Sequence, residues 1–315
     1  MNATMPQLRN PGPTWGFAFL SRVQRLVPRW LLHVPLVLGT WVAVVAMPVQ
    51  RRHSLDFLSD VLGRRARWFD VWRHFFAFLD LLLLRLRVAS GEKAQCSLEP
   101  ENGDDMAALM DSGEPALFGA FHFGHSDLLG FLLATRGRRV AMIRLRVGNS
   151  ADTAMLEQQF GGSVSFIWVN DAENLLFAMK TALERGDSLA MQCDRLFSSR
   201  TASFQFFGAR RLFPFAIYHV AILFGRPVMF CVGLPDGAGG TRVIASPLYR
   251  PQPSLDRAEN LRHAHDHFQA VLNRLEVLVR RYPLLWFNFV PHNPIVPAAQ
   301  GASLAATPAA ARGQS

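Results

Sequence analysis

Two polar residues that lie close together in the sequence, His122 and Asp127, are candidates for acid–base chemistry. They belong to the segment FGAFHFGHSD, in which an apolar run leads to Gly124 and then to Ser126, a residue type that often caps a helix. A loop at Gly124 would let the imidazole fold back onto the carboxylate, which would accept Nδ1–H and leave Nε2 as a base. Such a base can take the proton of a hydroxyl that attacks a thioester, and nearby backbone amides could bind the oxyanion.

The spacing of these residues also admits other interpretations. His125 and Asp127 form a competing pair, and the residues could simply be unrelated polar groups near the start of a helix. His122, His125 and Asp127 could together ligate a metal, but no HExxH motif or comparable cluster supplies a further ligand. We therefore expect neither a metal nor an organic cofactor.

The elements around His122 alternate between strands and helices. Short β-branched and apolar runs predict strands, and longer patterns with helical spacing predict helices. The predicted strands are 116–121, 139–144, 164–169, 188–193, 227–232 and 241–244, and the predicted helices are 127–134, 151–159, 171–185, 215–224 and 254–282. This alternation indicates an α/β fold with a central, mostly parallel sheet flanked by helices. His122 would then stand where the first of these strands ends.

Composition and charge restrict the class of protein. The chain has 315 residues, of which 50% are hydrophobic, and a net charge of +9. Residues 1–90 contain twelve arginines and four acidic residues, so they carry eight of the nine net positive charges. The three cysteines are widely spaced and predict reduced thiols. A disulfide-rich miniprotein and a disordered chain are excluded, and nucleic acid is not expected as a partner because the arginines are interleaved with Leu, Phe and Trp.

The N-terminal region predicts an association with membranes. Residues Trp30 to Gln50 carry no formal charge over a length that could cross a bilayer, or could form a buried or interfacial helix. The next stretch, Leu55 to Val88, has bulky apolar residues at helical spacing with arginines between them, which is typical of a helix that lies among lipid headgroups. We therefore expect a helical membrane anchor at 1–90, an α/β domain at 91–293 and a disordered tail at 294–315.

Several blocks together carry a family resemblance. They are the segment RARWFDVWRHFFAF, the His-x4-acid motif, a strand ending in Asp194-Arg195, the sequence Phe206-Phe207-Gly208 and the aromatic block Tyr282–Phe289. In their order and spacing, from about Trp15 to His292, the chain resembles the bacterial lipid A biosynthesis acyltransferase family. That family is a branch of the lysophospholipid acyltransferase superfamily.

The resemblance implies the transfer of a fatty acyl chain from acyl carrier protein, or from acyl-CoA, to a lipid-linked hydroxyl. The reaction would take place at the cytoplasmic face of the inner membrane and would need no cofactor. His122 would be the general base and Asp127 its partner. Asp194 matches the family's second acidic position, which shapes the site, and Arg195 beside it would contact substrate.

The chain departs from the family pattern at two places. The family has Gly-Asn-Trp-Glu after the histidine, whereas this chain has Gly-His-Ser-Asp, so the shorter Asp127 requires a closer approach of the loop. An arginine of the family is replaced near Gln158–Gly161, and Arg144 or Arg146 is the candidate to take its place in binding substrate. Two other functions stay open: a hydrolase that uses the same His/Asp pair, and a non-catalytic lipid-binding protein of the membrane.

Overall fold

The apolar runs of the sequence form a seven-stranded sheet in the computed structural model, which describes residues 29–89, 92, 95–145, 162–171, 173–196, 200–237, 239–287 and 289–297. A separate hairpin consists of β6 and β7. The strands are β1 (Cys96–Leu98), β2 (Leu117–Ala120), β3 (Val140–Arg144), β4 (Val164–Trp168), β5 (Ser188–Gln192), β6 (Thr201–Phe206), β7 (Ala209–Pro214), β8 (Val228–Pro235) and β9 (Thr241–Ala245).

The sheet has the strand order β1-β9-β8-β2-β5-β3-β4. Its paired neighbours are parallel except for β8 and β9, which run antiparallel. Crossover connections therefore bring β2 and β5 side by side, although they are far apart in the chain. The predicted mostly parallel α/β sheet is confirmed, and the predicted helix 151–159 lies outside the described residues.

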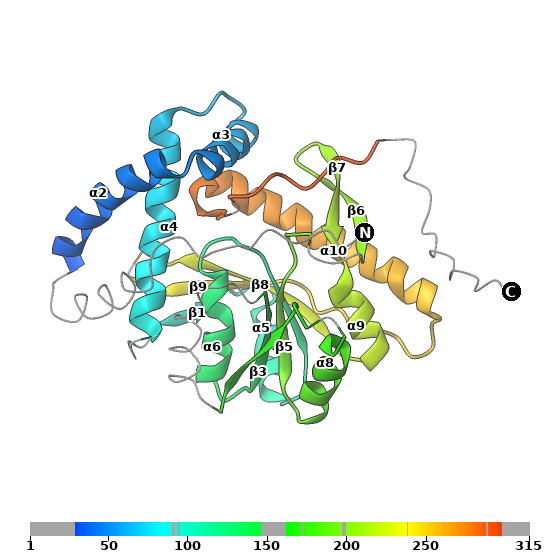
Figure 1. The fold of residues 1–315 in the computed structure, drawn as a ribbon. Helices are drawn as coiled ribbons and strands as arrows, with labels where there is room; N and C mark the ends of the chain where they lie inside the picture. Colours follow the sequence, from blue (N-terminus) through cyan, green and yellow to red (C-terminus); the bar gives the residue numbers. More distant parts are fainter. Residues whose placement is uncertain are drawn as a thin grey trace, which may run out of the picture.

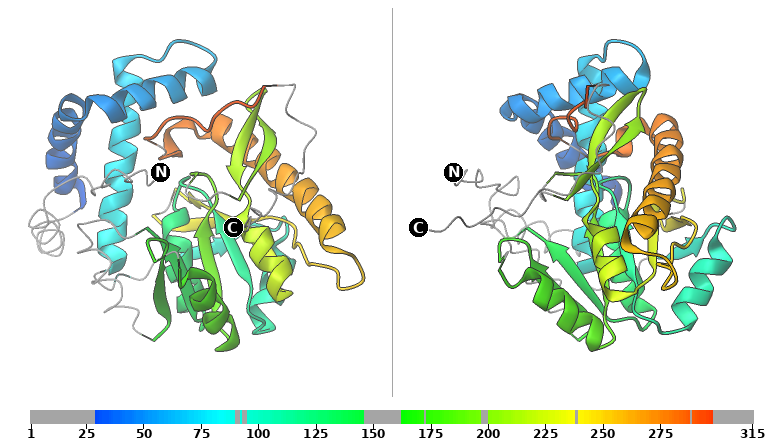
Figure 2. Two further views of the ribbon diagram at one scale, coloured as in Figure 1. Left: turned by 45° about the vertical axis from the view of Figure 1, so that its right-hand side comes forward. Right: turned by 90° about the vertical axis from the view of Figure 1, so that its right-hand side faces the viewer.

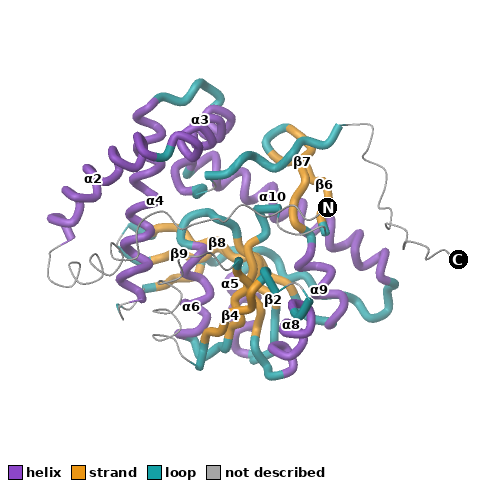
Figure 3. The backbone as a smooth tube through the Cα atoms, viewed as in Figure 1, coloured by secondary structure: helices purple, strands orange, loops and turns teal. Residues whose placement is uncertain are grey.

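Helices cover the sheet on both sides (Figure 1, Figure 3). They are α2 (Arg29–Ala46), α3 (Pro48–Leu62), α4 (Trp68–Ala89), α5 (Gly103–Asp111), η1 (Ser126–Leu128), α6 (Leu129–Thr135), α8 (Leu175–Glu184), α9 (Ala216–Phe224), α10 (Arg257–Arg281) and η2 (Pro283–Leu285). Strand β8 illustrates the two faces, because Val228 and Phe230 pack with α8, α9 and α10, whereas Met229 and Cys231 pack with α5 and α6. A strand buried on both faces needs a continuous apolar run, which is what β8 has.

Three elements were absent from the sequence-based prediction, and two other features differ from it. Strand β1, helix α5 and the β6–β7 hairpin were not predicted, and the hairpin lies along α10 in both views of Figure 2. Helix α10 begins at Arg257, later than the predicted residue 254, and its cap is Asp256, which forms a capping box with Glu259. Pro294 and Val296 hydrogen bond to β7, so disorder from Pro294 onward is wrong for residues 294–297.

The predicted N-terminal anchor is not one continuous helix. The uncharged run breaks at Met47, and Pro48 begins a new helix because proline lacks the N–H that would continue the old one. In the described part of the chain no single helix is long and apolar enough to cross a membrane. The helices His33–Ala46 and Pro48–Leu62, which are bent by 97° relative to each other, are together long and apolar enough to do so.

The helices α3 and α4 are also part of the main core. Phe57 and Leu58 of α3 and Val71 and Phe75 of α4 are buried in the same cluster as the strands of the sheet. Figure 1 shows α2, α3 and α4 gathered at one end of the molecule, with α4 running down towards the sheet. The N-terminal helices therefore build on the α/β core, and the predicted division at residue 90 stays a prediction.

The loop after β2 depends on a glycine. Gly124 has φ +58°, and a Cβ there would lie 2.1 Å from the carbonyl oxygen of Gly233. Gly63 has a similar φ of +62° at the end of α3, but a Cβ at that position would meet no atom of the described residues within 4 Å. The two glycines therefore share a backbone conformation and differ in the space around them.

We expect Gly63→Ala to lower the free energy of unfolding by about 1 kcal/mol, the cost of a left-handed alanine. Gly124→Ala has the same conformational cost and also pushes the loop away from β8, so we expect a loss at least twice as large. Urea unfolding followed by tryptophan fluorescence measures both values. Equal losses in the two variants would show that the loop does not need the close approach to Gly233.

Candidate active site

The geometry of the parallel sheet places a histidine and an aspartate together. Strand β2 pairs with β5 so that Leu117 lies opposite Leu189, and this register is an offset of 72 residues. His122 and Asp194 have the same offset and follow the carboxyl ends of these two strands. Because neighbouring parallel strands end at the same edge of a sheet, the two side chains meet there.

The carboxylate of Asp194 holds His122 at two points. Its Oδ1 lies 2.7 Å from Nδ1 of His122, and its Oδ2 accepts the backbone N–H of the same residue at 2.8 Å. The side chain of Asp194 is fully buried, whereas that of His122 is 17% exposed. A carboxylate at Nδ1 favours the tautomer with the proton on Nδ1, so Nε2 carries the lone pair and can act as a base.

Electrostatics keep Asp194 charged. Burial disfavours the carboxylate form, but the charge of His122, its hydrogen bonds and the charge of Arg195 outweigh that cost and hold the pKa of Asp194 below its ordinary value. The amide of Asn293 also donates to the backbone carbonyl of Asp194 at 2.9 Å. His122 and Asp194 are therefore held in this arrangement by contacts within the protein.

These contacts correct the predicted partner of His122. The sequence assigns the Nδ1 position to Asp127, whereas the bond at this atom goes to Asp194. Asp127 follows along the same chain segment and lies in η1, but its side chain is outside the described residues. Pairing between strands brings in a residue from a distant segment, which local spacing cannot reveal.

The prediction of Ser126 as a helix cap is wrong, and the expectation that nearby amides bind an oxyanion does not hold for four of them. Ser126 does not cap a helix, because its hydroxyl donates to the carbonyl of Phe123 at 2.5 Å. The nearby backbone amides already have acceptors within the protein. Phe123 N donates to Phe121 O, Gly124 N to Leu285 O, His125 N to Gly233 O and Ser126 N to Phe123 O. These four amides therefore do not bind a substrate oxyanion in this conformation.

The two histidines of the motif, His122 and His125, lie in different surroundings and have different partners. Nδ1 of His125 lies 2.8 Å from the hydroxyl of Thr241 in β9, away from Asp194. Burial lowers the pKa of His125 to about 4, although the charge of Asp236 opposes the shift. Within the described ranges no group of three or more His, Cys, Asp or Glu side chains is arranged to hold a metal ion. His125 therefore anchors the loop to the edge of the sheet.

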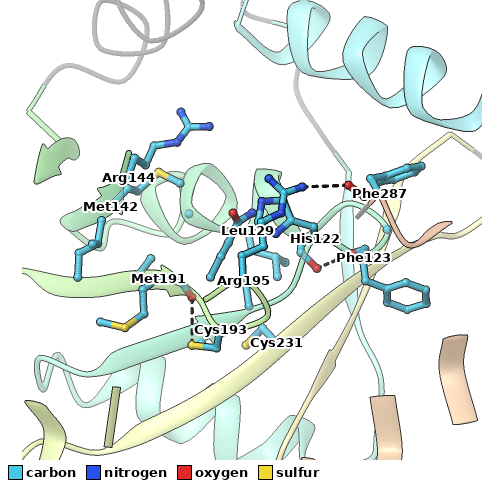
Figure 4. A pocket seen from close by; sticks show the side chains of 18 of the residues that line it. His122, Phe123, Leu129, Met142, Arg144, Met191, Cys193, Arg195, Cys231 and Phe287 are labelled. Carbon is cyan, nitrogen blue, oxygen red and sulfur yellow. Dashed lines mark hydrogen bonds between the residues drawn. The ribbon is translucent and has the colours of Figure 1, made fainter. Parts of the chain in front are cut away.

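The predicted substrate-binding arginines both line a cavity beside His122. Arg195 follows Asp194 directly, and its Nη2 donates to the carbonyl of Phe287 at 3.1 Å. Arg144 ends strand β3, and its guanidinium lies over the ring of Phe166, 5.6 Å from the ring centroid. Figure 4 shows Arg195 next to His122, with Arg144 on a separate strand. The alternative Arg146 lies outside the described residues.

The cavity itself is large and mostly apolar, with a volume of about 780 Å³. Its wall combines His122 with apolar side chains from α4, α6, α8, α9 and the sheet. Representative lining residues are Phe78, Leu82, Leu129, Leu133, Met142 and Met191. All three cysteines of the chain also line it, and burial raises the pKa of the Cys193 and Cys231 thiols well above their ordinary value. A space of this size and composition suits a small molecule with a long apolar part.

A segment near the C-terminus closes over the loop that carries His122. Phe287 N donates to His122 O at 2.7 Å, and Gly124 N donates to Leu285 O at 2.7 Å. The carbonyl of Trp286 in turn accepts from Nε2 of His74 in α4 at 2.8 Å. His74 was not singled out in the sequence. The aromatic block Tyr282–Phe289 was, and its backbone rather than its rings makes these contacts.

Among the comparisons with known proteins, the one with solved structures finds a similarity. No protein-family model matches the chain, and no curated protein matches it. Among solved structures, the chain is similar to the crystal structure of the 1-acyl-sn-glycerophosphate (LPA) acyltransferase PlsC from Thermotoga maritima, with 13% sequence identity and a TM-score of 0.36. That match covers 79% of this chain and 98% of the other.

The burial of His74 predicts a sensitivity to acid. Its side chain is fully buried, Nδ1 lies 2.8 Å from the hydroxyl of Ser54, and burial lowers its pKa from 6.5 to about 4. In the unfolded chain His74 binds a proton below about pH 6.5, whereas in the folded chain it binds one only below about pH 4. The stability that the neutral imidazole contributes is therefore present at neutral pH and lost as the pH falls.

We expect His74→Gln to lose about 2 kcal/mol less free energy of unfolding than the parent between about pH 7.5 and about pH 5. Glutamine can still donate to the Trp286 carbonyl but does not titrate. Urea titrations at the two pH values measure the difference. The exposed His263 of α10 provides the control His263→Gln, which should keep the parent's pH dependence. An unchanged pH dependence in His74→Gln would refute the assignment.

Proposed function

We propose that this protein is a membrane-associated O-acyltransferase that moves a fatty acyl chain from an acyl thioester to a lipid-linked hydroxyl. The observation that carries the proposal is that His122, paired with the buried Asp194, lies at the wall of a large apolar cavity. A base alone fits many reactions, but a base beside a long apolar space fits a substrate that combines an acyl chain with a reactive carbonyl. Each methylene buried there contributes about 0.8 kcal/mol to binding.

In the proposed reaction each of these groups has one role. Nε2 of His122 accepts the proton of the acceptor hydroxyl while the hydroxyl oxygen attacks the thioester carbonyl carbon. The carbonyl π electrons move onto oxygen and give a tetrahedral oxyanion. When the carbonyl re-forms, the C–S bond breaks, and the leaving thiolate takes the proton from His122. Asp194 stabilises the imidazolium between these two steps, and no cofactor is needed.

The finer assignment rests on the sequence resemblance alone. It supports a lipid A-type acyltransferase that uses acyl carrier protein, or acyl-CoA, as donor and works at the cytoplasmic face of the inner membrane. The cavity does not distinguish between these donors, because both present the same thioester and acyl chain. Asp127 keeps its place in this proposal as a second carboxylate of the motif.

We expect His122→Ala to lower kcat for acyl transfer by about 10³-fold, within the usual range for the loss of a general base. Asp194→Asn should lower it by at least about 10²-fold, because an amide can donate to Nδ1 and favour the wrong tautomer. The assay follows labelled acyl chains from acyl carrier protein to membrane lipid. His263→Ala, an exposed change on α10, is the matched control and should keep parent activity.

Two results would replace the proposal. Fatty-acid release that depends on His122 but needs no acceptor lipid would indicate a hydrolase. No turnover of any thioester by the parent, despite lipid binding, would favour a non-catalytic lipid-binding protein. Parent-level transfer by His122→Ala would leave the activity in place but exclude His122 as its base.

Helix α2 supports the proposed membrane contact. Leu38, Trp41, Val42 and Val45 are large apolar residues with exposed fractions between 47% and 68%. Val42 also lines the cavity, so the exposed apolar surface continues into the space beside His122. A lipid-facing α2 would therefore let an acyl chain pass from the bilayer into the cavity.

Arginines are frequent in the segment that follows α2, and Arg51 contacts α2 directly by donating to the carbonyl of Val44. Arg51 of α3 lies over the exposed Trp68, 4.8 Å from the ring centroid, and Arg52, Arg65 and Arg67 are also exposed. Arginines beside exposed aromatic residues are typical of a helix pair in the headgroup region of an anionic membrane.

We expect the double substitution Val42→Asp/Val45→Asp to weaken binding to vesicles of phosphatidylcholine and phosphatidylglycerol by at least about tenfold, because two charges would enter the apolar layer. Parent binding should weaken when salt is raised or when phosphatidylglycerol is omitted. Co-sedimentation with vesicles measures each value. Val277→Asp, at an exposed valine of α10, is the matched control. Equal binding by the double variant and the parent would exclude α2 as the membrane contact.

A further inference from the structure

A transferred acyl group needs a positive partner for its carbonyl oxygen. In the reaction proposed above, negative charge gathers on that oxygen when the hydroxyl attacks. Sites of this kind stabilise the charge with hydrogen-bond donors that are already in place. The backbone amides from Phe123 to Ser126 are engaged with carbonyls of the chain, which directs attention to side-chain donors of the cavity wall.

Arg195 lies where such a donor is needed. It follows Asp194 in the chain and lines the same cavity as His122, and Figure 4 draws the two side chains close together in its view. The other described arginines of the cavity wall are Arg85, Arg136 and Arg144. Arg144 extends from β3, which is separated from β2 by β5, and Arg85 and Arg136 come from α4 and the end of α6. Arg195 is the one that shares its chain segment with the dyad.

One residue fixes the arginine relative to the base. Phe287 N donates to the carbonyl of His122 at 2.7 Å, and Phe287 O accepts from Nη2 of Arg195 at 3.1 Å. The backbone of Phe287 therefore sets the spacing between the guanidinium and the imidazole. A guanidinium has five N–H donors, so a bond to Phe287 is compatible with another to a substrate oxygen. A donor held in this way needs little reorganisation when charge develops.

We propose that Arg195 is a catalytic residue that binds the thioester carbonyl oxygen and stabilises the oxyanion of the tetrahedral intermediate. The acceptor oxygen forms the new C–O bond, its proton goes to Nε2 of His122, and the carbonyl electron pair rests on the oxygen that faces Arg195. The pair returns when the C–S bond breaks, and the thiolate leaves with the proton. This inference rests on the proposed acyl transfer.

The test compares Arg195→Met, Arg195→Lys and Arg195→Ala with the parent. Arg195→Met should lower kcat by about 10²- to 10³-fold and change KM for the acyl donor by less than about threefold, because the lost bond forms only as charge develops. Arg195→Lys, which keeps the positive charge, should retain more activity than Arg195→Met. Arg262→Met, at an exposed arginine of α10, is the matched control and should equal the parent.

Chemical rescue separates catalysis from support of the fold. Millimolar guanidinium chloride should raise kcat of Arg195→Ala in a saturable way, whereas sodium chloride should not, and neither should restore His122→Ala. Thermal unfolding is measured for every variant. Unchanged kcat in Arg195→Met would overturn the proposal. So would a loss of activity in all three variants that accompanies lower melting temperatures and resists rescue.

Failure of this inference can be told apart from failure of the proposed function. If the parent transfers acyl chains and His122→Ala does not, the function stands, and the Arg195 variants alone decide the oxyanion role. If the parent shows no transfer, the proposed function and this inference fail together.

Discussion

The contact between Asp194 and His122 is the interaction on which the site depends. One carboxylate uses one oxygen to orient the ring and the other to hold the backbone of the same residue. Its charge survives burial because the imidazole and Arg195 lie beside it. Without that charge the histidine would have neither a defined tautomer nor a partner for its protonated form. Surrounding elements keep this contact in place: the register of β2 and β5 brings the two residues to one edge of the sheet, and the segment Leu285–Phe287, secured by His74 of α4, pairs with the loop after β2.

Sequence patterns predicted the fold more completely than the site. The strand before His122 and the helix α10 follow from apolar periodicity, because each is long enough or buried enough to leave a clear pattern. The β6–β7 hairpin was missed because its strands lack a simple alternation and include charged residues such as Arg210 and Arg211.

The partner of His122 could not be read from local spacing. Asp127 was favoured because it is near in the chain, whereas Asp194 becomes a neighbour only through strand pairing. One signal was available: His122 follows Leu117 at the same spacing as Asp194 follows Leu189. That equality has meaning only if β2 and β5 are adjacent, which an isolated sequence does not establish. His74 left no pattern at all, since a single histidine in an aromatic helix is compatible with many roles.

The pairing of Leu285–Phe287 with the loop of His122 has a consequence for biosynthesis. The residues that brace the base and the arginine, together with Asn293, which binds the Asp194 carbonyl, leave the ribosome long after the base itself. A nascent chain can therefore assemble its strands before the segment that contacts His122 and Arg195 has emerged.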